Sequence, residues 1–223
     1  IIGPNLVITG NFEQGNTGFS SDYGPPQGCA FGPLSVPGTY EVNTSPANTH
    51  INFAACQDNS NVGIGQMLVA NGSQIAGDDI WCQTVQVVPG NDYIYSAFAT
   101  SVVPGTPANL QLTIDGATVA SLQLGSTTCD WEFFGANYNS GASTQVELCI
   151  TNLETADGGK DFALDDIEFR PVCQGTETVT VEVSDIQTTV VATTEEICGG
   201  DGMGSAEVQA SGGIVASEYT YLW

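Results

Sequence analysis

Short strand-like runs separated by turn residues extend along the whole 223-residue chain, and this pattern limits the fold more than any other feature. Alternating or β-branched runs, which are typical of strands, cover residues 6–9, 81–88, 93–100, 109–114 and 145–151. Turn sequences separate the runs, and the Asp115-Gly116 pair between two of them predicts a tight hairpin. No segment keeps a helical period. The sequence therefore predicts an all-β protein whose antiparallel strands pack as a sandwich.

The charge balance excludes several classes of partner. The chain has 25 acidic residues and two basic ones, Lys160 and Arg170, which gives a formal net charge of -23. Such a field repels phosphate groups, so nucleic acids and anionic membranes are poor partners, whereas cations, above all calcium, are favoured. No apolar run approaches the length of a bilayer span, so we expect no membrane insertion of this segment.

The cysteines indicate an oxidising compartment. There are seven, none in a CxxC spacing, and this usage predicts disulfides and an exported protein. Six of them lie between residues 29 and 173 and could close three bridges. The loop-rich stretch over residues 19–61 suggests that Cys29 pairs with Cys56. Cys198 stands alone, and we expect its partner to lie beyond the end of this sequence.

The strand pattern changes near Cys173, where a Gln-Gly pair precedes a new series of strand-like runs. This change predicts a first domain over residues 1–173 and a second over residues 174–223. The second is too short to form a sandwich by itself, so we expect it to be incomplete.

Two stretches far apart in the sequence resemble the first and last strands of the galactose-binding-like jelly rolls found in carbohydrate-binding modules. They run from Asn5 to Glu13 and from Asp161 to Phe169. Between them, residues 67–73 and 81–85 resemble a version of this domain common in large secreted proteins of gliding and marine Bacteroidetes-type bacteria. The resemblance covers residues 1–173 and implies a jelly-roll β-sandwich in which the two stretches lie side by side.

A second resemblance covers the last part of the chain. Residues 198–208, 211–213 and 219–223 are similar to the start of the SprB-type repeat of gliding-motility adhesins. The sequence departs from that family at Val215 to Glu218, where a proline is usual. The resemblance implies that a partial immunoglobulin-like β repeat follows the jelly roll, within a very long adhesin at the cell surface.

The jelly-roll resemblance also implies a structural calcium ion where the first and last strands meet. The matching residues are Glu13, Asp165 and Asp166, with Asn11 as a further candidate. Carboxylate and carbonyl oxygens are the ligands that calcium prefers.

The residues themselves add a physical reason. Strand alternation would place Asp165 on the face of Ile167 and Phe169, so one acid of the Asp165-Asp166 pair should point inward and need a cation or hydrogen-bond donors. The alternative is that this acid accepts hydrogen bonds from loop amides or pairs with Lys160 or Arg170.

Exposed aromatic rings are the natural partners of sugar rings, with amide and carboxylate groups reading the hydroxyls. The candidate ligand-binding residues are Tyr23, Trp131, Phe134 and Tyr138, and no motif distinguishes them. We assign Trp81 to the core, because it alternates with Gln83 and Val85 in an apolar run.

Catalysis is poorly supported, because the chain has one histidine, His50, and no GxSxG, HExxH or P-loop spacing. The sequence therefore predicts a non-catalytic segment of a secreted cell-surface adhesin that binds glycans or surfaces through the jelly roll. One alternative is a structural spacer or filament building block, which packs against neighbouring domains or subunits and has no soluble ligand. Another is a targeting module of a secreted polysaccharide hydrolase.

Overall fold

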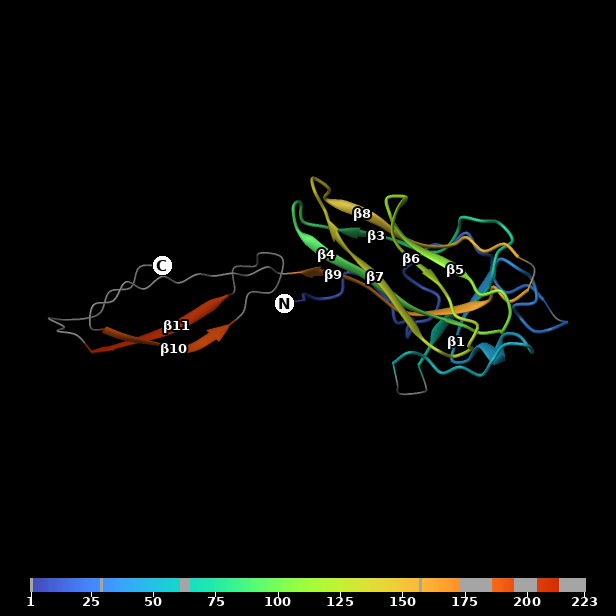
Figure 1. Ribbon diagram of the computed structural model, residues 1–223, viewed down its shortest axis with the longest axis horizontal. Coiled ribbons are helices and arrows are strands. Elements are labelled where there is room, and N and C mark those ends of the chain that lie inside the picture. Colours follow the sequence, from blue (N-terminus) through green and yellow to red (C-terminus); the bar gives the residue numbers. More distant parts are fainter. Residues whose placement is uncertain are drawn as a thin grey trace. The chain divides into compact units, whose positions relative to one another are not determined.

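The computed structural model describes residues 2–28, 30–60, 65–156, 158–172, 186–194 and 204–212. The chain divides into two compact units, which are drawn in Figure 1. The larger unit is Pro4–Pro171, and the smaller one combines Ile1–Gly3 with Val172–Trp223.

The larger unit is a sandwich of two antiparallel sheets. The five-stranded sheet has the order β1 (Thr39–Asn43), β2 (Met67–Asn71), β9 (Phe162–Val172), β4 (Asp92–Ser101), β7 (Glu132–Asn139). The four-stranded sheet has the order β3 (Asp78–Gln86), β8 (Gln145–Asn152), β5 (Asn109–Ile114), β6 (Ala117–Gln123). A short 3-10 helix, η1 (Pro46–Asn48), follows β1. The all-β, jelly-roll sandwich predicted from the sequence is confirmed.

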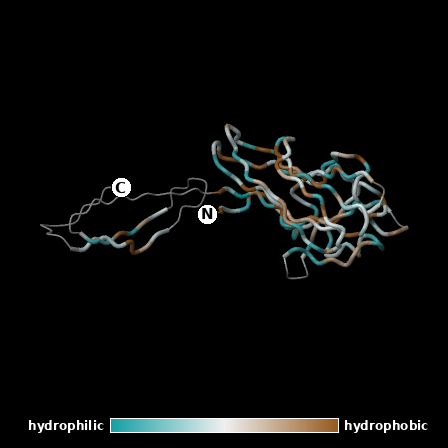
Figure 2. The backbone as a smooth tube through the Cα atoms, in the orientation of Figure 1, coloured by the Kyte–Doolittle hydropathy of each residue, from teal (hydrophilic) through white to brown (hydrophobic). Residues whose placement is uncertain are grey.

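The main core lies between the two sheets and is formed by the inward-facing apolar residues of their strands. Figure 2 shows the hydrophobic residues distributed along these strands. On β4, for example, Tyr93, Tyr95, Ala97 and Ala99 are buried in this core. Trp81 on β3 is completely buried, as predicted.

A second apolar cluster covers part of the opposite face of the five-stranded sheet. On β2, Leu68 and Ala70 belong to the main core, whereas Met67 and Val69 belong to the second cluster. Successive strand residues point to opposite faces, so the second cluster lies outside the sandwich. It includes Leu34 from the loop before β1 and Phe53 and Cys56 from the segment between β1 and β2, so both segments pack over this face.

Residues 6–9 do not form the strand that their sequence predicts. They run beside β9, where Leu6 N donates to Phe169 O (2.8 Å) and Ile167 N donates to Gly10 O (2.9 Å). Left-handed backbone at Thr9 and Phe12, with φ of 63° and 55°, prevents a regular ladder. A Cβ atom at Gly10 would lie 2.1 Å from Ile167 O, so this close approach needs glycine. The prediction that the two distant stretches lie side by side is nevertheless confirmed.

The β5–β6 hairpin turns at Asp115 and Gly116, as predicted. Their φ values of 48° and 77° are those of a tight turn with two left-handed residues. Ile114 and Ala117 pair on either side of the turn.

Two disulfides lie among the described residues, Cys56–Cys129 and Cys82–Cys149. The predicted Cys29–Cys56 bridge is wrong, because Cys56 is bonded to Cys129, which lies just before β7. Cys29, Cys173 and Cys198 lie outside the described residues.

In the smaller unit, β10 (Ile186–Thr194) and β11 (Ser205–Gly212) pair antiparallel, with a register shift between Val190 and Ala192. Much of the stretch that resembles the adhesin repeat lies outside the described residues.

Candidate functional site

Four acidic residues from three separate segments approach one another, and we call them the acidic cluster: Glu13, Asp58, Asp165 and Asp166. Glu13 follows the stretch that runs beside β9, Asp58 lies in the loop between η1 and β2, and the other two are consecutive in β9. The family resemblance indicated three of the four. It missed Asp58, because nothing local in the sequence marks the residue that the loop brings to this place.

Gly65 lies between Glu13 and Asp58. A Cβ atom on this glycine would lie 2.6 Å from Glu13 Oε1 and 2.3 Å from Asp58 Oδ2, so the two carboxylates converge on the same point. Glu13 Oε1 also accepts a hydrogen bond from Gln66 N (2.8 Å).

Asn59 joins the loop to β9. Its backbone N–H donates to Asp165 Oδ2 (2.9 Å), and its side-chain amide donates to Asp166 Oδ2 (2.8 Å). Amide groups of the loop therefore donate a hydrogen bond to each acid of the pair. This agrees with the alternative prediction, in which loop amides satisfy the buried acid in place of a cation. Of the two basic side chains, Arg170 pairs with Glu168 (2.6 Å), and Lys160 Nζ donates to Ala156 O (2.6 Å).

Asp165 and Asp58 are both buried, with 1% and 5% of their surface exposed. Burial raises the pKa of Asp165 to about 7, the N–H of Asn59 opposes the rise, and the charges of Asp166 and Asp58 add to it. Asp58 Oδ1 is buried without a hydrogen-bond partner among the described residues. A buried carboxylate oxygen in this state needs a hydrogen-bond donor or a cation.

The prediction that one acid of the pair is buried is confirmed for Asp165, but its physical basis is corrected. Leu164, Ile167 and Phe169 all belong to the main core, so one extra residue interrupts the strand alternation. Asp166 has φ of 47°, which marks the interruption. Asp165 is thus buried away from the face of Ile167 and Phe169.

The donor set suits a hard cation, since it consists of oxygen atoms alone. Among the described residues, one group of three His, Cys, Asp or Glu side chains has its ligand atoms within 4.8 Å of one another. It consists of Asp79, Cys82 and Cys149, and its two sulfurs form a disulfide. The carboxylates of the acidic cluster are spread more widely. A cation there would also need amide, hydroxyl or backbone oxygens, which calcium accepts. Asn11, the fourth predicted ligand, is exposed and joins none of the cluster's hydrogen bonds.

Two of the four predicted sugar-stacking rings are not accessible. Phe134 is buried in the main core, and Tyr23 is 4% exposed, with its hydroxyl accepting a hydrogen bond from Ser73 N (3.0 Å). Burial raises the pKa of Tyr23 to about 12. The predicted exposure of these two rings is therefore wrong, because both side chains point into the sandwich.

The other two predicted rings are partly buried. Tyr138 packs against the main core, 6.3 Å from the ring of Phe169. Trp131 packs against the second apolar cluster, and its indole N–H donates to Gln57 O (3.0 Å). A role for either ring in ligand binding stays a prediction.

A patch on the outer face of the five-stranded sheet was missed by the sequence reasoning, and we call it the open face: Ile94, Phe98, Phe133 and Asn137. Residues that alternate with these on β4 and β7 lie in the main core, so the four point outward. Phe98 pairs with Phe133 and Ile94 with Asn137 across the two strands.

The open face carries an aromatic pair. The rings of Phe98 and Phe133 are 5.4 Å apart at 65°, and Phe133 is 58% exposed. The ring of Phe133 lies close to Gly135, the next outward position of β7, since a Cβ atom there would lie 3.2 Å from Phe133 Cζ and 2.8 Å from Ser96 Cβ. Asn137 is exposed two outward positions further along β7, and exposed rings and amides on one face are groups that bind sugar rings.

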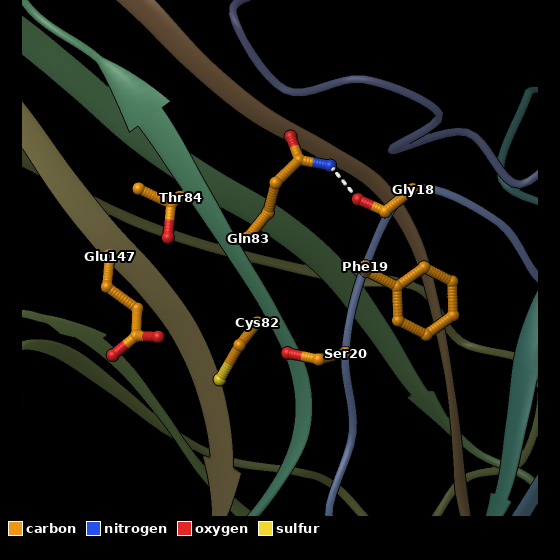
Figure 3. Close-up of a pocket in the computed structure, with 7 residues that line it drawn as sticks. All are labelled: Gly18, Phe19, Ser20, Cys82, Gln83, Thr84 and Glu147. Carbon is orange, nitrogen blue, oxygen red and sulfur yellow. Dashed lines mark hydrogen bonds between the residues drawn. The ribbon is translucent and has the colours of Figure 1, made fainter.

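A shallow cavity of about 390 Å³ lies where the segment Gly18 to Ser20 meets β3 (Figure 3). Gln83 Nε2 donates to Gly18 O, and Glu147 and Thr84 lie on the other side. The ring of Phe19 points away from these two residues. The cavity therefore offers no aromatic face to a ligand.

A second cavity, of about 260 Å³, lies among the loops around the start of β9. Its lining includes His50, Phe53, Asn52, Gln74 and Asp161. The rings of His50 and Phe53 are 4.6 Å apart, and His50 Nδ1 accepts a hydrogen bond from Asn52 N (3.2 Å). Burial lowers the pKa of His50 and so favours its neutral form, and because Nδ1 accepts a hydrogen bond, that form carries its proton on Nε2. The size and the mixture of rings, amides and a carboxylate would suit a single sugar unit.

Comparison with solved structures finds proteins of the same fold. The CBM22-1 xylan-binding domain of Paenibacillus barcinonensis Xyn10C has a TM-score of 0.51 and 19% identity, over 78% of this chain and 97% of that domain. The CBM22-1–CBM22-2 tandem domain of the same protein gives 0.50 and 16%, over 94% of this chain and 61% of the tandem. A Stig cyclase, Fisc from Fischerella sp. TAU, gives 0.50 and 12%, over 77% and 98%. The larger unit thus has the jelly-roll fold of these carbohydrate-binding modules.

No protein-family model and no curated protein matches the chain. Among the described residues, no helix is long and apolar enough to span a membrane.

Proposed function

We propose that the larger unit is a non-catalytic glycan-binding module and that its open face is the binding surface. The observation that carries this proposal is the exposed ring of Phe133 beside Phe98, with the amide of Asn137 on the same face. The likeness of the fold to xylan-binding domains supports a glycan as the ligand. A sheet face suits a polysaccharide chain, whereas the cavity beside Asp161 suits one sugar unit.

Affinity measurements with soluble polysaccharides, xylan among them, test the proposal. We expect Phe133→Ala to weaken binding about tenfold, because one stacking ring contributes about 1 kcal/mol or more. Phe31→Ala is the matched control, since Phe31 is 49% exposed but lies in the loop before β1. Trp131→Ala and Tyr138→Ala test the two half-buried rings predicted from the sequence.

Two results would contradict the proposal. Equal affinity of the wild type and Phe133→Ala would exclude the open face. No binding to any glycan would favour the rival role, a structural spacer that packs against neighbouring domains or subunits.

The acidic cluster is proposed to hold a structural calcium ion, with Glu13, Asp58 and Asp165 as carboxylate ligands and Asp166 beside them. The Oδ1 of Asp58 supports this assignment, because it is buried without a hydrogen-bond partner among the described residues. The ion would tie the loop before β2 to β9, two parts of the chain that are about a hundred residues apart.

Thermal unfolding with and without calcium tests this site. Calcium at a hundred times its dissociation constant should stabilise the folded state by about 2.7 kcal/mol, and EDTA should reverse this. For a domain of this size, the melting temperature should rise by roughly 5–10 °C. Asp58→Asn should abolish the response, whereas Asp115→Asn, which removes one charge at the β5–β6 turn, should keep it. An unchanged transition in EDTA would contradict the site.

The wider setting is also a proposal. Disulfides favour an extracellular protein, and we propose that residues 1–173 and 174–223 are neighbouring domains of a secreted surface adhesin, the second an SprB-like repeat. The non-catalytic role rests on the sequence, which has one histidine and no nucleophile motif. A cyclase of the same fold demonstrates that the jelly roll alone does not decide this question. If the flanking sequence encodes a polysaccharide hydrolase, the module would instead target that enzyme.

A further inference from the structure

Asp58 lies in a loop that has no regular secondary structure between residues 54 and 60. A residue of such a loop loses conformational entropy when it is held in one place, and favourable contacts must offset this loss. Since Asp58 is buried and oriented toward Gly65, other contacts must hold it.

The residues just before Asp58 are held by contacts with the segment that precedes β7. Cys56 is bonded to Cys129, and Gln57 O accepts the indole N–H of Trp131 at 3.0 Å. The disulfide and the hydrogen bond therefore act on two consecutive residues, and Asp58 is the next one.

Cys129, the disulfide partner, and Ala54, an earlier residue of the loop, are both fixed to the end of β4. Cys129 N donates to Ser101 O (3.1 Å), and Ala54 N donates to Val102 O (2.7 Å). Cys129 has φ of 64°, a conformation that a residue other than glycine keeps only where its surroundings impose it. The loop is thus attached to the sheet immediately before Asp58.

We infer that the Cys56–Cys129 disulfide and the indole N–H of Trp131 form a clamp that holds Asp58 at the acidic cluster, so that cation affinity depends on both. This inference rests on the calcium site proposed above. Trp131 is then a positioning residue for the cation site. Its indole N–H is engaged by the loop, and its ring covers the second apolar cluster.

The second disulfide supplies a matched control. Cys82–Cys149 closes 67 residues, against 73 for Cys56–Cys129, so the two constrain the unfolded chain to a similar extent. Cys82 and Cys149 are directly paired residues of β3 and β8, and neither strand carries a residue of the acidic cluster. Its removal should weaken the fold without releasing Asp58.

Calorimetric titration of the full chain with Ca²⁺ tests the clamp, well below the melting temperature of each variant. We expect Cys56→Ser/Cys129→Ser to bind Ca²⁺ at least tenfold more weakly than the wild type, because the loop must be ordered on binding. Cys82→Ser/Cys149→Ser should bind with the affinity of the wild type.

Trp131→Phe keeps the test valid if the cysteine variants do not fold. It retains a ring but removes the N–H, and the loss of one hydrogen bond should weaken Ca²⁺ binding about three- to tenfold. Trp81→Phe is the control, because the buried indole N–H of Trp81 has no partner among the described residues. That variant should be less stable but should bind Ca²⁺ normally.

The outcomes separate the two proposals. No Ca²⁺ binding by the wild type would overturn the calcium site and the clamp together. Binding that is equally strong in Cys56→Ser/Cys129→Ser and in Trp131→Phe would overturn the clamp and leave the site. An equal loss in both disulfide variants would also overturn the clamp, because general destabilisation would then explain it.

Discussion

The two disulfides close loops of similar length, yet they lie in regions built in opposite ways. Cys82 and Cys149 are opposite each other in a ladder that extends from Asp78 and Asn152 to Gln86 and Gln145. Cys56 and Cys129 join two irregular segments. In the ladder, backbone hydrogen bonds already place the side chains. A disulfide therefore adds stability wherever it closes a long loop, but it determines local geometry only where no ladder does so.

The largest expected effect is on the free energy of unfolding, to which the two disulfides should contribute by similar amounts. The chain-entropy model gives about 4 kcal/mol for closing a loop of either length. We therefore expect Cys56→Ser/Cys129→Ser and Cys82→Ser/Cys149→Ser to lose similar free energies of unfolding, measured by denaturant titration in EDTA. A loss below about 1 kcal/mol for the first pair would mean that the loop is held mainly by its hydrogen bonds, and the comparison would fail.

A smaller effect concerns the raised pKa of one acid in each region. Burial raises the pKa of Asp165 to about 7, and it also raises the pKa of Asp79, which lies close to the sulfurs of Cys82 and Cys149. The folded state holds the proton of Asp165 more tightly than the unfolded chain does. The stability from this proton is therefore fully present below about pH 4 and is lost as the pH rises to about 7.

Unfolding measurements between pH 4 and pH 8 in EDTA check this expectation. The free energy of unfolding should fall across this interval in the wild type, and the fall should be smaller in Asp165→Asn. Asp79→Asn should keep most of the fall, because Asp79 is only half-buried and accepts a hydrogen bond from the Thr151 hydroxyl (2.5 Å). Calcium should oppose the fall, because it binds the ionised carboxylates. A flat wild-type profile in EDTA would contradict the raised pKa.

The aromatic residues demonstrate how one position changes a functional prediction. Phe134 and Phe133 are neighbours in β7, and the sequence analysis named Phe134, but not Phe133, among four candidate exposed rings. Successive strand residues point to opposite faces, and the structure places Phe134 in the core and Phe133 on the open face. Nothing in β7 itself tells which face will be covered, because both rings are equally apolar.

The acidic cluster likewise contains one residue, Asp58, that the sequence alone did not indicate. Glu13, Asp165 and Asp166 were found because the chain resembles a known family at those positions. Asp58 lies about a hundred residues before β9 in the sequence, within a loop of ordinary polar residues. Its place depends on the disulfide and on the hydrogen bond from Trp131, and neither contact has a local sequence signal.

The sequence by itself determined most of the β-strands, the tight turn at Asp115 and the excess of negative charge, because alternation, turn preference and charge are properties of neighbouring residues. Tertiary structure alone decided which face of the five-stranded sheet stays open, which cysteines pair, and which loop residue joins the acidic cluster. The reason is physical. These features depend on contacts between segments far apart in the chain, and such contacts form only when the whole sandwich packs.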